Sequence, residues 1–578
     1  MSAVLEAQEP TARYLEAAQP ALVRQFDLLG SAPGGISRLR ELILTLAVQG
    51  KLAPQLPGEE PASLLLRQIE SAKERLIAAG AMKRPKIKDE IAEDELPFPT
   101  PPGWRWVRLG TLLQKIGAGS TPLGGKEVYV PSGVKFLRSQ NVWNDGLRLD
   151  GVAYISPATH AKMAGTVVTA NDLLFNITGA SIGRCAAVPA DFDEANVSQH
   201  VTIIRPVLPA LNPFLHTVLI SRLVQQAVME VQVGVSREGL SIAKLGNFLV
   251  PIPPLQEQAR IVARVADLMR LCDALEAKGR LEAEQHARLL CTLLDTLTDS
   301  ITPEELAANW QRVADHFDLL LDRPEAVDAL EQTILQLAVR GLLVPQDPQD
   351  EPAIQLVKRI GAHRKRLIAE GRTRLREHHP SLEREAERPL PLGWETVQLG
   401  ALIELVSGQH LGPSEYQEGL GAELPYLTGP AEFGEFSPAP TRSTAERRAV
   451  ARRGDILITV KGSGVGKLNV VTQPEIAISR QLMAVRSLGT YDQYLFLVLR
   501  SMSEKFQSQS VGIAIPGIGR DDIAGAVIAL PPLPEQIRIV ARVTELRRLC
   551  AGLRQRLDQS SATQTALADA LVEQTLAA

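Results

Sequence analysis

The stretch PIPPLQEQARIVARVADLMRLCDAL, residues 251–275, decides the fold, because a near-copy, ALPPLPEQIRIVARVTELRRLCAGL, follows at residues 529–553. Each copy begins with prolines, which helix interiors exclude, and continues with apolar residues in steps of four and three, the a and d pattern of a coiled coil. We therefore predict two long helices with equivalent apolar stripes that pack together. The stripes consist of Ile261, Val265, Leu268, Cys272 and Leu275 in the first copy, and of Ile539, Val543, Leu546, Cys550, Leu553 and Leu557 in the second.

The repeat extends over nearly the whole chain. ILTLAVQGKLAPQ at Ile43 matches ILQLAVRGLLVPQ at Ile334, and PPGWRWVRLG ending at Gly110 matches PLGWETVQLG ending at Gly400. Further on, NDLLFNITGASIGR at Asn171 matches GDILITVKGSGVGK, and the offset has fallen from 290 to 283 residues. Insertions and deletions collect in surface loops, which often carry recognition. The chain is thus a tandem duplication of two units of roughly 290 residues.

Composition limits the class of protein. With 578 residues and 45% hydrophobic content the chain can bury several cores, and a net charge of −4 argues against a globally basic surface while leaving room for a local one. Four cysteines without close pairing indicate a reducing compartment. No apolar run reaches about 18 residues, and Glu6 and Glu9 lie where a signal peptide would be basic. We therefore expect a soluble cytoplasmic protein without membrane contact.

Helical and β-rich stretches alternate along each unit. We predict helices before Gly35 and over residues 36–49, 61–79, 213–231, 326–340 and from 256 onward, with Gly50 and Gly341 at positive φ after a helix. Residues 134–137, 173–177 and 201–204 predict strands. The final helix should pack beside the first ones, so that the chain closes with pseudo-twofold symmetry and a helical bar holds two α/β domains apart.

Three motifs occur twice in the same order: a GW-x-x-V-x-LG turn, a D-(I/L)-L-(F/I) strand leading to a Gly-rich turn that ends in Arg or Lys, and a PPL-x-EQ-x-RIV helix start. This order resembles the DNA-specificity subunit of Type I restriction-modification systems, over nearly the whole chain. The resemblance implies two target-recognition domains, each reading one half of a split, asymmetric site in double-stranded DNA. It also implies helices that set the distance between them and bind two methyltransferase subunits, with restriction (motor) subunits joining the complex.

The fold class expected from repeat and resemblance is α/β with long helices. It is a tandem pseudo-twofold repeat in which an antiparallel helical coiled-coil spacer separates two α/β target-recognition domains. Glu257, Glu535 and the two apolar stripes are the candidates for the spacer and the subunit interface. We expect a helical region and linker at 1–95, target-recognition domains at 96–254 and 389–531, a central helical region and linker at 255–388, and a last helix at 532–578.

Candidate DNA contacts fall on loops that follow short apolar strands. The loop at 138–141 carries side chains suited to base edges, and an ordinary surface turn is an equally good explanation. The Gly-rich turns TGASIGR and KGSGVGK end in a cation and have amides for phosphates, although a buried tight turn explains them as well. Arg237 and Arg520 are candidate phosphate clamps. The full set is Arg138, Ser139, Gln140, Asn141, Thr178, Ser181, Arg184, Arg237, Thr428, Lys461, Ser463, Lys467, Arg480 and Arg520.

Other residues in these stretches have a structural explanation that we prefer. Ser198 and Ser479 suit hydrogen bonding within the fold, and Trp104 and Trp394 suit packing of each α/β domain on its helix. The basic segment 358–376 is a candidate to flank DNA, but a solvated helix face is the commoner explanation. The unlike sequences KFLRSQNVW at 135–143 and LPYLTGPAE at 424–432 occupy matching places, which predicts unlike half-sites.

Catalytic motifs are missing. The prolines at 253–254 follow Ile252, so the (D/N)PP(Y/F) motif of adenine methyltransferases is absent, as are a Gly-rich cofactor loop, metal-ligand spacing and a nucleophile elbow. We therefore expect no catalysis and no cofactor on this chain, with S-adenosylmethionine, ATP and Mg²⁺ on partner subunits as the resemblance implies. Two alternatives are a coiled-coil scaffold whose domains bind protein and a stand-alone nuclease with a cryptic site.

Overall fold

The structure is a computed structural model that describes residues 29–30, 32–82, 84, 91–122, 124–233, 239–371, 390–421, 423–434, 437–462, 464–509 and 517–577. The chain divides into two compact units. Unit 1 comprises residues 1–282 and 561–578, and unit 2 comprises residues 283–560. The helix predicted before Gly35 falls almost entirely outside the described residues.

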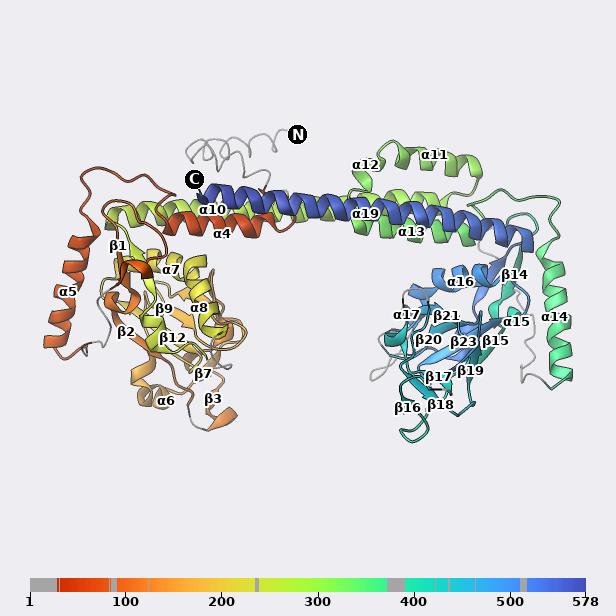
Figure 1. Cartoon of the computed structure of the whole chain (residues 1–578), viewed down its shortest axis with the longest axis horizontal. Helices are drawn as coiled ribbons and strands as arrows, with labels where there is room; N and C mark the ends of the chain where they lie inside the picture. Colours follow the sequence, from red (N-terminus) through yellow and green to blue (C-terminus); the bar gives the residue numbers. More distant parts are fainter. Residues whose placement is uncertain are drawn as a thin grey trace. The chain divides into compact units, whose positions relative to one another are not determined.

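Two long helices pass from one unit into the other: α10 (Leu255–Asp299) begins in unit 1, and α19 (Leu533–Ala577) begins in unit 2. Unit 1 adds α4 (Gly35–Val48) and α5 (Ala62–Ala78), and unit 2 adds their counterparts α13 (Pro324–Val339) and α14 (Ala353–Ala369) (Figure 1). Unit 2 also contains α11 (Pro303–Ala314) and α12 (Phe317–Leu320). The helices predicted at 36–49, 61–79 and 326–340 are thus confirmed.

The glycines after α4 and α13 have the predicted backbone. Gly50 has φ +71° and Gly341 has φ +75°. A Cβ at Gly50 would come within 2.9 Å of the Trp104 ring, and a Cβ at Gly341 would come equally close to the ring of Trp394. Glycine is therefore required at both positions for two reasons. It adopts the positive φ of the turn, and it leaves room for a tryptophan ring at the end of the helix.

The α/β domain of unit 1 contains one two-stranded, one four-stranded and one five-stranded sheet, in the orders β1-β13, β10-β9-β12-β2 and β3-β7-β4-β11-β8, and a β5-β6 hairpin. All strand pairs are antiparallel except β4 with β11. The strands are β1 (Arg105–Arg108), β2 (Leu113–Ala118), β3 (Tyr129–Val130), β4 (Val134–Leu137), β5 (Val142–Trp143), β6 (Gly146–Leu147), β7 (Ala153–Ile155), β8 (Val167–Val168), β9 (Leu173–Asn176), β10 (Cys185–Ala187), β11 (Ala195–Val197), β12 (Val201–Pro206) and β13 (Leu249–Ile252). The strands predicted at 134–137, 173–177 and 201–204 are β4, β9 and β12.

Short helices complete this domain. They are α6 (Pro157–Lys162), α7 (Asn212–Ile220), α8 (Arg222–Val233) and α9 (Ile242–Gly246). The single helix predicted over 213–231 is wrong, because Ser221, with extended φ and ψ of −75° and 161°, separates α7 from α8. The buried Ser221 hydroxyl donates to the Val218 carbonyl (2.6 Å), and the Ser221 carbonyl accepts from the amides of Val224 and Gln225. Serine thus ends one helix and starts the next through its own hydrogen bonds.

Unit 2 repeats the same plan. Its sheets have the orders β14-β24, β15-β23-β20-β21 and β16-β18-β17-β22-β19, and β17 with β22 is again the parallel pair. The strands are β14 (Glu395–Gln398), β15 (Ile403–Ser407), β16 (Gln417–Glu418), β17 (Leu424–Leu427), β18 (Arg442–Thr444), β19 (Val450–Arg452), β20 (Ile456–Thr459), β21 (Leu468–Val470), β22 (Glu475–Ile478), β23 (Leu482–Ser487) and β24 (Val527–Leu530). The helices of this domain are α15 (Leu399–Leu402), α16 (Asp492–Ser501), α17 (Ser503–Gln509) and α18 (Arg520–Ala524).

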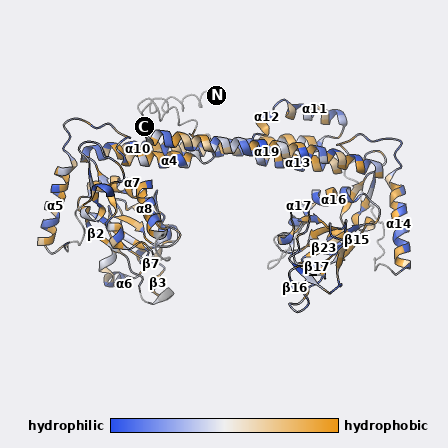
Figure 2. Ribbon diagram, viewed as in Figure 1, coloured by the Kyte–Doolittle hydropathy of each residue, from blue (hydrophilic) through white to orange (hydrophobic). Residues whose placement is uncertain are grey.

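The apolar stripes of the two long helices are buried in different cores. The stripe of α10 shares a core with α4, the first α/β domain and the end of α19, whereas the stripe of α19 shares a core with α13, the second α/β domain and the end of α10. Hydrophobic and hydrophilic residues alternate along both helices in Figure 2. The prediction that the two long helices pack together is confirmed, because the stripe of each helix shares a core with the C-terminal part of the other, in addition to a short helix and an α/β domain. Packing of the last helix beside the first ones is confirmed by Ala568, Val572 and Leu576, which join the core that contains α4.

Ion pairs reinforce the packing of the short helices. Arg40 of α4 binds Asp273 and Glu276 of α10 (2.6 and 2.7 Å), and Arg38 binds Asp569 of α19 (2.5 Å). In unit 2, Arg554 of α19 binds Asp328 of α13 (2.5 Å). These pairs are partly exposed, so each contributes at most about 1 kcal/mol, and the apolar cores provide most of the stability.

A buried glutamate explains the repeated PPL-x-EQ-x-RIV motif. Glu257, in the first turn of α10, accepts hydrogen bonds from the indole Nε1 of Trp104 (3.1 Å) and from Gln55 Nε2 (3.0 Å). Glu535 accepts the same bonds from Trp394 (3.0 Å) and Gln346 (3.2 Å). Each carboxylate thus links three segments of its unit. These are the start of the long helix, the tryptophan directly before β1 or β14, and the loop after α4 or α13. We call these two sites the Trp–Glu–Gln anchors.

The neighbouring motif residues complete each anchor. Gln258 Nε2 donates to the Pro253 carbonyl (2.9 Å), and Gln536 does the same to Pro531 (3.0 Å). Burial raises the pKa of Glu257 and Glu535 above the usual range of a glutamate, and the tryptophan and glutamine donors oppose that shift. Because each carboxyl holds its proton more tightly in the folded chain than in the unfolded one, its contribution to stability is present below the unfolded pKa and falls as the pH rises through the folded pKa.

Removing one indole donor should loosen one anchor and leave the other intact. We expect Trp104→Phe to destabilise unit 1 by about 1–3 kcal/mol, because Glu257 remains buried with one donor fewer. In hydrogen-exchange mass spectrometry of the full chain, amides of β1 and the first turns of α10 should exchange faster, while β14 and the start of α19 stay unchanged. Trp394→Phe is the matched control with the reverse pattern, and equal effects on both anchors from either variant would contradict the assignment.

Candidate nucleic-acid interface

Three loops of unit 1 that the sequence singled out converge around Asn176, the last residue of β9. The Asn176 side-chain Nδ2 donates to the Ser139 carbonyl (2.9 Å) and to Ser181 Oγ (3.1 Å), which ties the loop after β4 to the Gly-rich turn 177–184. Thr178 Oγ1 and His200 Nδ1 lie 2.6 Å apart, which ties that turn to the loop after β11. Asn176 is fully buried and was not predicted as a site residue.

Backbone hydrogen bonds fix the same convergence. The amide of Ser198 donates to the Leu137 carbonyl (2.9 Å), and the amide of Leu240 donates to the Ile177 carbonyl (2.8 Å). The hydroxyl of Ser198 is buried without a partner among the described atoms, so the expected structural role of this serine is carried by its backbone. The loop segment before Leu240 contains Arg237, which lies outside the described residues.

Within the loop after β4, the candidate side chains differ in exposure. Asn141 is only 2% exposed; its Oδ1 accepts from the Arg138 amide (2.9 Å) and its Nδ2 donates to the Arg148 carbonyl (2.8 Å). Gln140 is exposed, and Arg138 and Ser139 are half-buried. The side chain of Asn141 thus shapes the loop, and Gln140 is its most accessible polar group.

The indole ring of Trp143, which lies beside this loop, makes cation–π contacts with two arginines. The guanidinium carbons of Arg148 and Arg184 each lie 3.7 Å from the centroid of the Trp143 ring. Both cations are therefore in contact with the indole of Trp143. Each cation–π contact at such a surface contributes about 0.5–1 kcal/mol. We call this arrangement the Arg–Trp–Arg stack.

Sequence reasoning identified Arg184 but missed Trp143 and Arg148. The overlooked signal is the Asn-Asp-Gly run at 144–146, which is typical of a tight β-hairpin turn and predicts that the chain reverses direction there. The resulting β5–β6 hairpin pairs Val142 with Leu147 and Trp143 with Gly146. The contact with Arg184 could not be read from the sequence, because it joins a different hairpin, formed by β9 and β10.

Unit 2 closes the equivalent loop with different side chains. Thr428 donates through its amide and its hydroxyl to Glu432 Oε2 (both 2.6 Å), where Arg138 of unit 1 uses Asn141. The Ser479 amide donates to the Leu427 carbonyl (3.0 Å) and its hydroxyl donates to the Thr428 carbonyl, so Ser479 has the expected structural role. Because the Thr428 hydroxyl is engaged with Glu432, its chemistry at the surface differs from that of Arg138.

Cations of unit 2 surround this loop. Lys461, Lys467 and Arg480 are exposed, and none forms an ion pair with a carboxylate among the described residues. Arg520, also exposed, donates to Ser407 Oγ (2.9 Å). The Ile518 amide donates to the Val460 carbonyl (3.0 Å), which brings the segment before Arg520 to the Gly-rich turn. Ser463 lies outside the described residues.

Buried ion pairs support the loops from below at equivalent places. Asp172, one residue before β9, binds Arg205 of β12 through two oxygens (2.6 and 2.7 Å). Asp455 binds Arg486 in the same way (2.9 and 2.7 Å). The hydrogen bonds to Asp172 raise the pKa of Arg205, which keeps this pair charged. Both domains therefore hold their strands with the same bidentate pair.

The stripe residues and the two glutamates that we predicted at the spacer and subunit interface are buried, or partly buried, against the cores of their own units. Their side chains serve helix packing, which leaves little of them for a partner. Apolar side chains that remain exposed on the same helices are Leu255, Leu281 and Leu289 on α10, and Ile537, Leu549 and Leu567 on α19. A partner of these helices would meet the exposed set.

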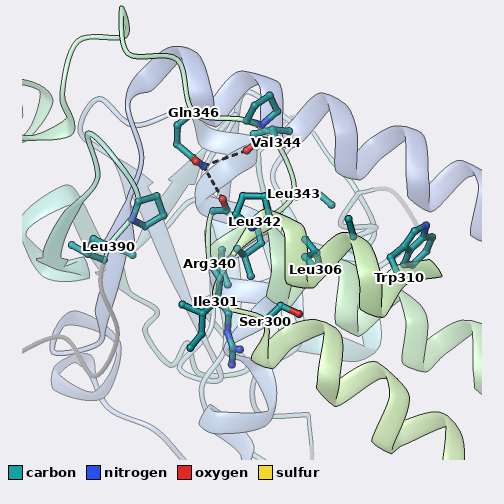
Figure 3. A pocket seen from close by; sticks show the side chains of 17 residues that line it. Ser300, Ile301, Leu306, Trp310, Arg340, Leu342, Leu343, Val344, Gln346 and Leu390 are labelled. Carbon is teal, nitrogen blue, oxygen red and sulfur yellow. Dashed lines mark hydrogen bonds between the residues drawn. The ribbon is translucent and has the colours of Figure 1, made fainter. Parts of the chain in front are cut away.

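A cavity of about 1400 Å³ lies elsewhere in unit 2, between α11, the end of α13 and β24 (Figure 3). Its lining is mainly apolar and includes Leu306, Trp310 and Leu390, and Gln346 donates there to the carbonyls of Gly341 (2.7 Å) and Val344 (3.3 Å). None of the candidate loop residues lines it. Across the described residues no group of three or more His, Cys, Asp or Glu side chains is placed to hold a metal ion, and no helix is both long and apolar enough to cross a bilayer.

Comparison with known proteins agrees with this arrangement. The family described as Type I restriction modification DNA specificity domain matches residues 101–285 and 391–559, which are the two α/β domains with the helices that follow them. The Type I restriction enzyme EcoEI specificity subunit of Escherichia coli is 32% identical over 578 residues, covering 94% of each chain. The EcoAI specificity subunit of the same organism is 32% identical and covers 93% of each chain.

A solved structure shows the same fold. It is described as "Structural basis underlying complex assembly and conformational transition of the type I R-M system", and it matches 83% of this chain and 99% of its own with a TM-score of 0.50 and 23% identity. The two repeated α/β domains, joined by long helices, and the two matches to the family domain leave one assignment. The chain belongs to the family of Type I restriction-modification DNA specificity subunits, a non-catalytic family.

Proposed function

We propose that this chain reads a bipartite, asymmetric site in double-stranded DNA, one half with each α/β domain. The observation that carries the proposal is that matching loops converge at the same place on the same frame in both units but present different side chains. Unit 1 presents Gln140 and the Arg–Trp–Arg stack, whereas unit 2 presents Lys461, Lys467 and Arg480. Arginine, glutamine and lysine supply the contacts to base edges and phosphates that DNA recognition needs. One frame with two kinds of loop suits two unlike half-sites.

The proposal includes the partners that the family implies. Two methyltransferase subunits would bind the long helices and methylate adenine with S-adenosylmethionine, and restriction subunits would add ATP- and Mg²⁺-dependent cleavage in the cytoplasm. The helices support such docking because Leu281, Leu289, Leu549 and Leu567 are each more than half exposed. Isolated exposed leucines are common, but four on two helices that also pack two cores favour a binding surface.

The basic helix α14 is a weaker candidate for DNA contact. Its cations between residues 353 and 369 include Arg359, which pairs with Glu351 (2.6 Å), and Arg364, which donates to the Gly400 carbonyl. These contacts lie within unit 2 and favour a solvated helix face that packs on its own domain. The part of the basic segment beyond residue 371 lies outside the described residues.

Cells that carry this chain and its methyltransferase partner should methylate adenine within one split motif. We expect methylome sequencing to show the motif in their DNA and to show its loss when the gene for this chain is deleted. In vitro, the full chain with methyltransferase subunits should retard duplexes that contain the motif and not scrambled ones. If neither the chain nor its complex selects DNA by sequence while a protein ligand binds the domains, the protein-binding scaffold is the better account.

Substitution in one loop should affect one half-site. We expect Arg138→Ala to relax base preference in the half read by unit 1, by about 1–3 kcal/mol of discrimination at the affected position. Thr428→Ala, at the matching position of unit 2, is the control and should affect the other half alone. The measurement is selection of bound duplexes from a randomised library, and an equal loss in both halves for either variant would refute the assignment.

Charge placed on the exposed leucines should disrupt assembly without unfolding the chain. We expect Leu549→Asp and Leu281→Asp to lower the yield of methyltransferase that copurifies with this chain at least about tenfold, since a buried unpaired carboxylate costs several kcal/mol. Leu56→Asp, on the surface loop between α4 and α5, is the control, because Leu56 is 49% exposed and lies off the long helices. Copurification unchanged by both helix variants would exclude these residues from the interface.

A further inference from the structure

The Arg–Trp–Arg stack is held in place by hydrogen bonds of the two hairpins that carry it. The indole Nε1 of Trp143 donates to the Gln140 carbonyl (2.8 Å), which fixes the plane of the ring. The Cys185 amide donates to Asn144 Oδ1 (3.0 Å), which ties the β5–β6 hairpin to β10, directly after Arg184. The ring and the two arginines are thereby positioned by two hairpins that brace each other.

The two guanidinium groups are poorly neutralised. Arg184 forms no ion pair with a carboxylate of the described residues, and the carboxylate nearest to Arg148 is Asp145, at 3.4 Å and with a largely exposed side chain. Contact with the indole occupies one face of each guanidinium, and apart from the Arg148 Nη2 that donates to Asp145 (3.4 Å) the N–H groups at the edges have no hydrogen-bond partner among the described residues. Two cations are therefore held against one indole ring, each 3.7 Å from its centroid.

In the described part of unit 2 there is no equivalent stack. The turns Ser139–Asn141 and Pro430–Glu432 are equivalent at an offset of 291, so Phe433 takes the place of Val142 and Gly434 that of Trp143, while Lys467 takes the place of Arg184 at the offset of 283. Among the described residues no cation lies over Phe433. Lysine offers a point charge, which suits a phosphate, whereas an immobilised guanidinium offers two parallel N–H donors. The difference between the units is thus one of recognition chemistry as well as charge.

We propose that the Arg–Trp–Arg stack is the element of unit 1 that reads guanine, through donation by Arg184 or Arg148 to guanine O6 and N7 in the major groove. This inference rests on the proposed function of the chain as a reader of split DNA sites. The fork of a positioned guanidinium matches guanine O6 and N7 as well as a phosphate, and we assign it to guanine because the stack lies beside a loop whose side chains differ between the two units, which is where base reading rather than backbone contact has to differ. Trp143 is a positioning residue, and the two arginines are the specificity-determining ones.

The test uses the full chain with methyltransferase subunits and duplexes that carry its selected motif. Replacing single guanines of one half-site by 7-deazaguanine removes N7, and we expect at least about a tenfold loss of binding at one or two positions. Arg184→Lys and Arg148→Lys keep the charge but lose the bidentate edge, so at least one of them should lose preference for the same guanine and become insensitive to 7-deazaguanine. Arg442→Lys is the matched control, because Arg442 of unit 2 also lies over an aromatic ring (Tyr416) but is paired with Glu418 (2.8 Å) and belongs to none of the candidate loops, so both half-sites should stay unchanged.

The outcomes separate this inference from the proposed function. If the wild-type complex selects a split motif but tolerates 7-deazaguanine throughout, or if the lysine variants keep the same motif, the stack contacts phosphate or is structural and the guanine assignment is overturned. If the wild-type complex selects no motif, the proposed function itself fails. The 7-deazaguanine arm uses unaltered protein, so a folding defect in a variant does not obscure the result.

Discussion

The buried glutamate at the start of each long helix is the contact on which the architecture depends. Glu257 and Glu535 each receive one indole and one amide donor, and these donors come from segments about 150 to 200 residues away in sequence. A buried carboxylate needs such donors, because an unsatisfied one costs far more than the bonds contribute. The anchor therefore determines where each α/β domain meets its helix, and its duplication gives both domains the same attachment.

A fixed attachment allows the loops to diverge. The loops after β4 and β17 are both closed by a side chain that accepts from the backbone amide of their first residue, Asn141 in one unit and Glu432 in the other. Below them the Asp172–Arg205 and Asp455–Arg486 pairs are nearly identical. The two units therefore share the buried ion pair below the loops and differ in the side chains at the surface. This arrangement is expected when one scaffold has to recognise two different ligands.

Much of the fold could be predicted from the sequence because its signals are local or repeated. The apolar stripe of α10, the glycine at position 50 and the strand at 173–176 follow from periodicity, turn chemistry and β-propensity. The break at Ser221 could not be predicted, since serine occurs within helices and only its hydrogen bonds to Val218, Val224 and Gln225 end α7. That a short helix and an α/β domain also cover each stripe could not be predicted, because periodicity gives a buried face but does not say which surfaces cover it.

The candidate interface was predictable in outline only. Arg138 and Arg184 were found because polar loops after apolar strands suggest recognition, but the burial of Asn141 and the role of Trp143 arise from contacts between hairpins. The most direct test of the account is a chain in which residues 400–527 are replaced by a second copy of residues 110–249, which duplicates the first reader on the second attachment. Methylome sequencing of cells with this chain should reveal a site built from two copies of the first half-site. A motif that still contains the original second half would contradict the claim that each domain independently reads its own half.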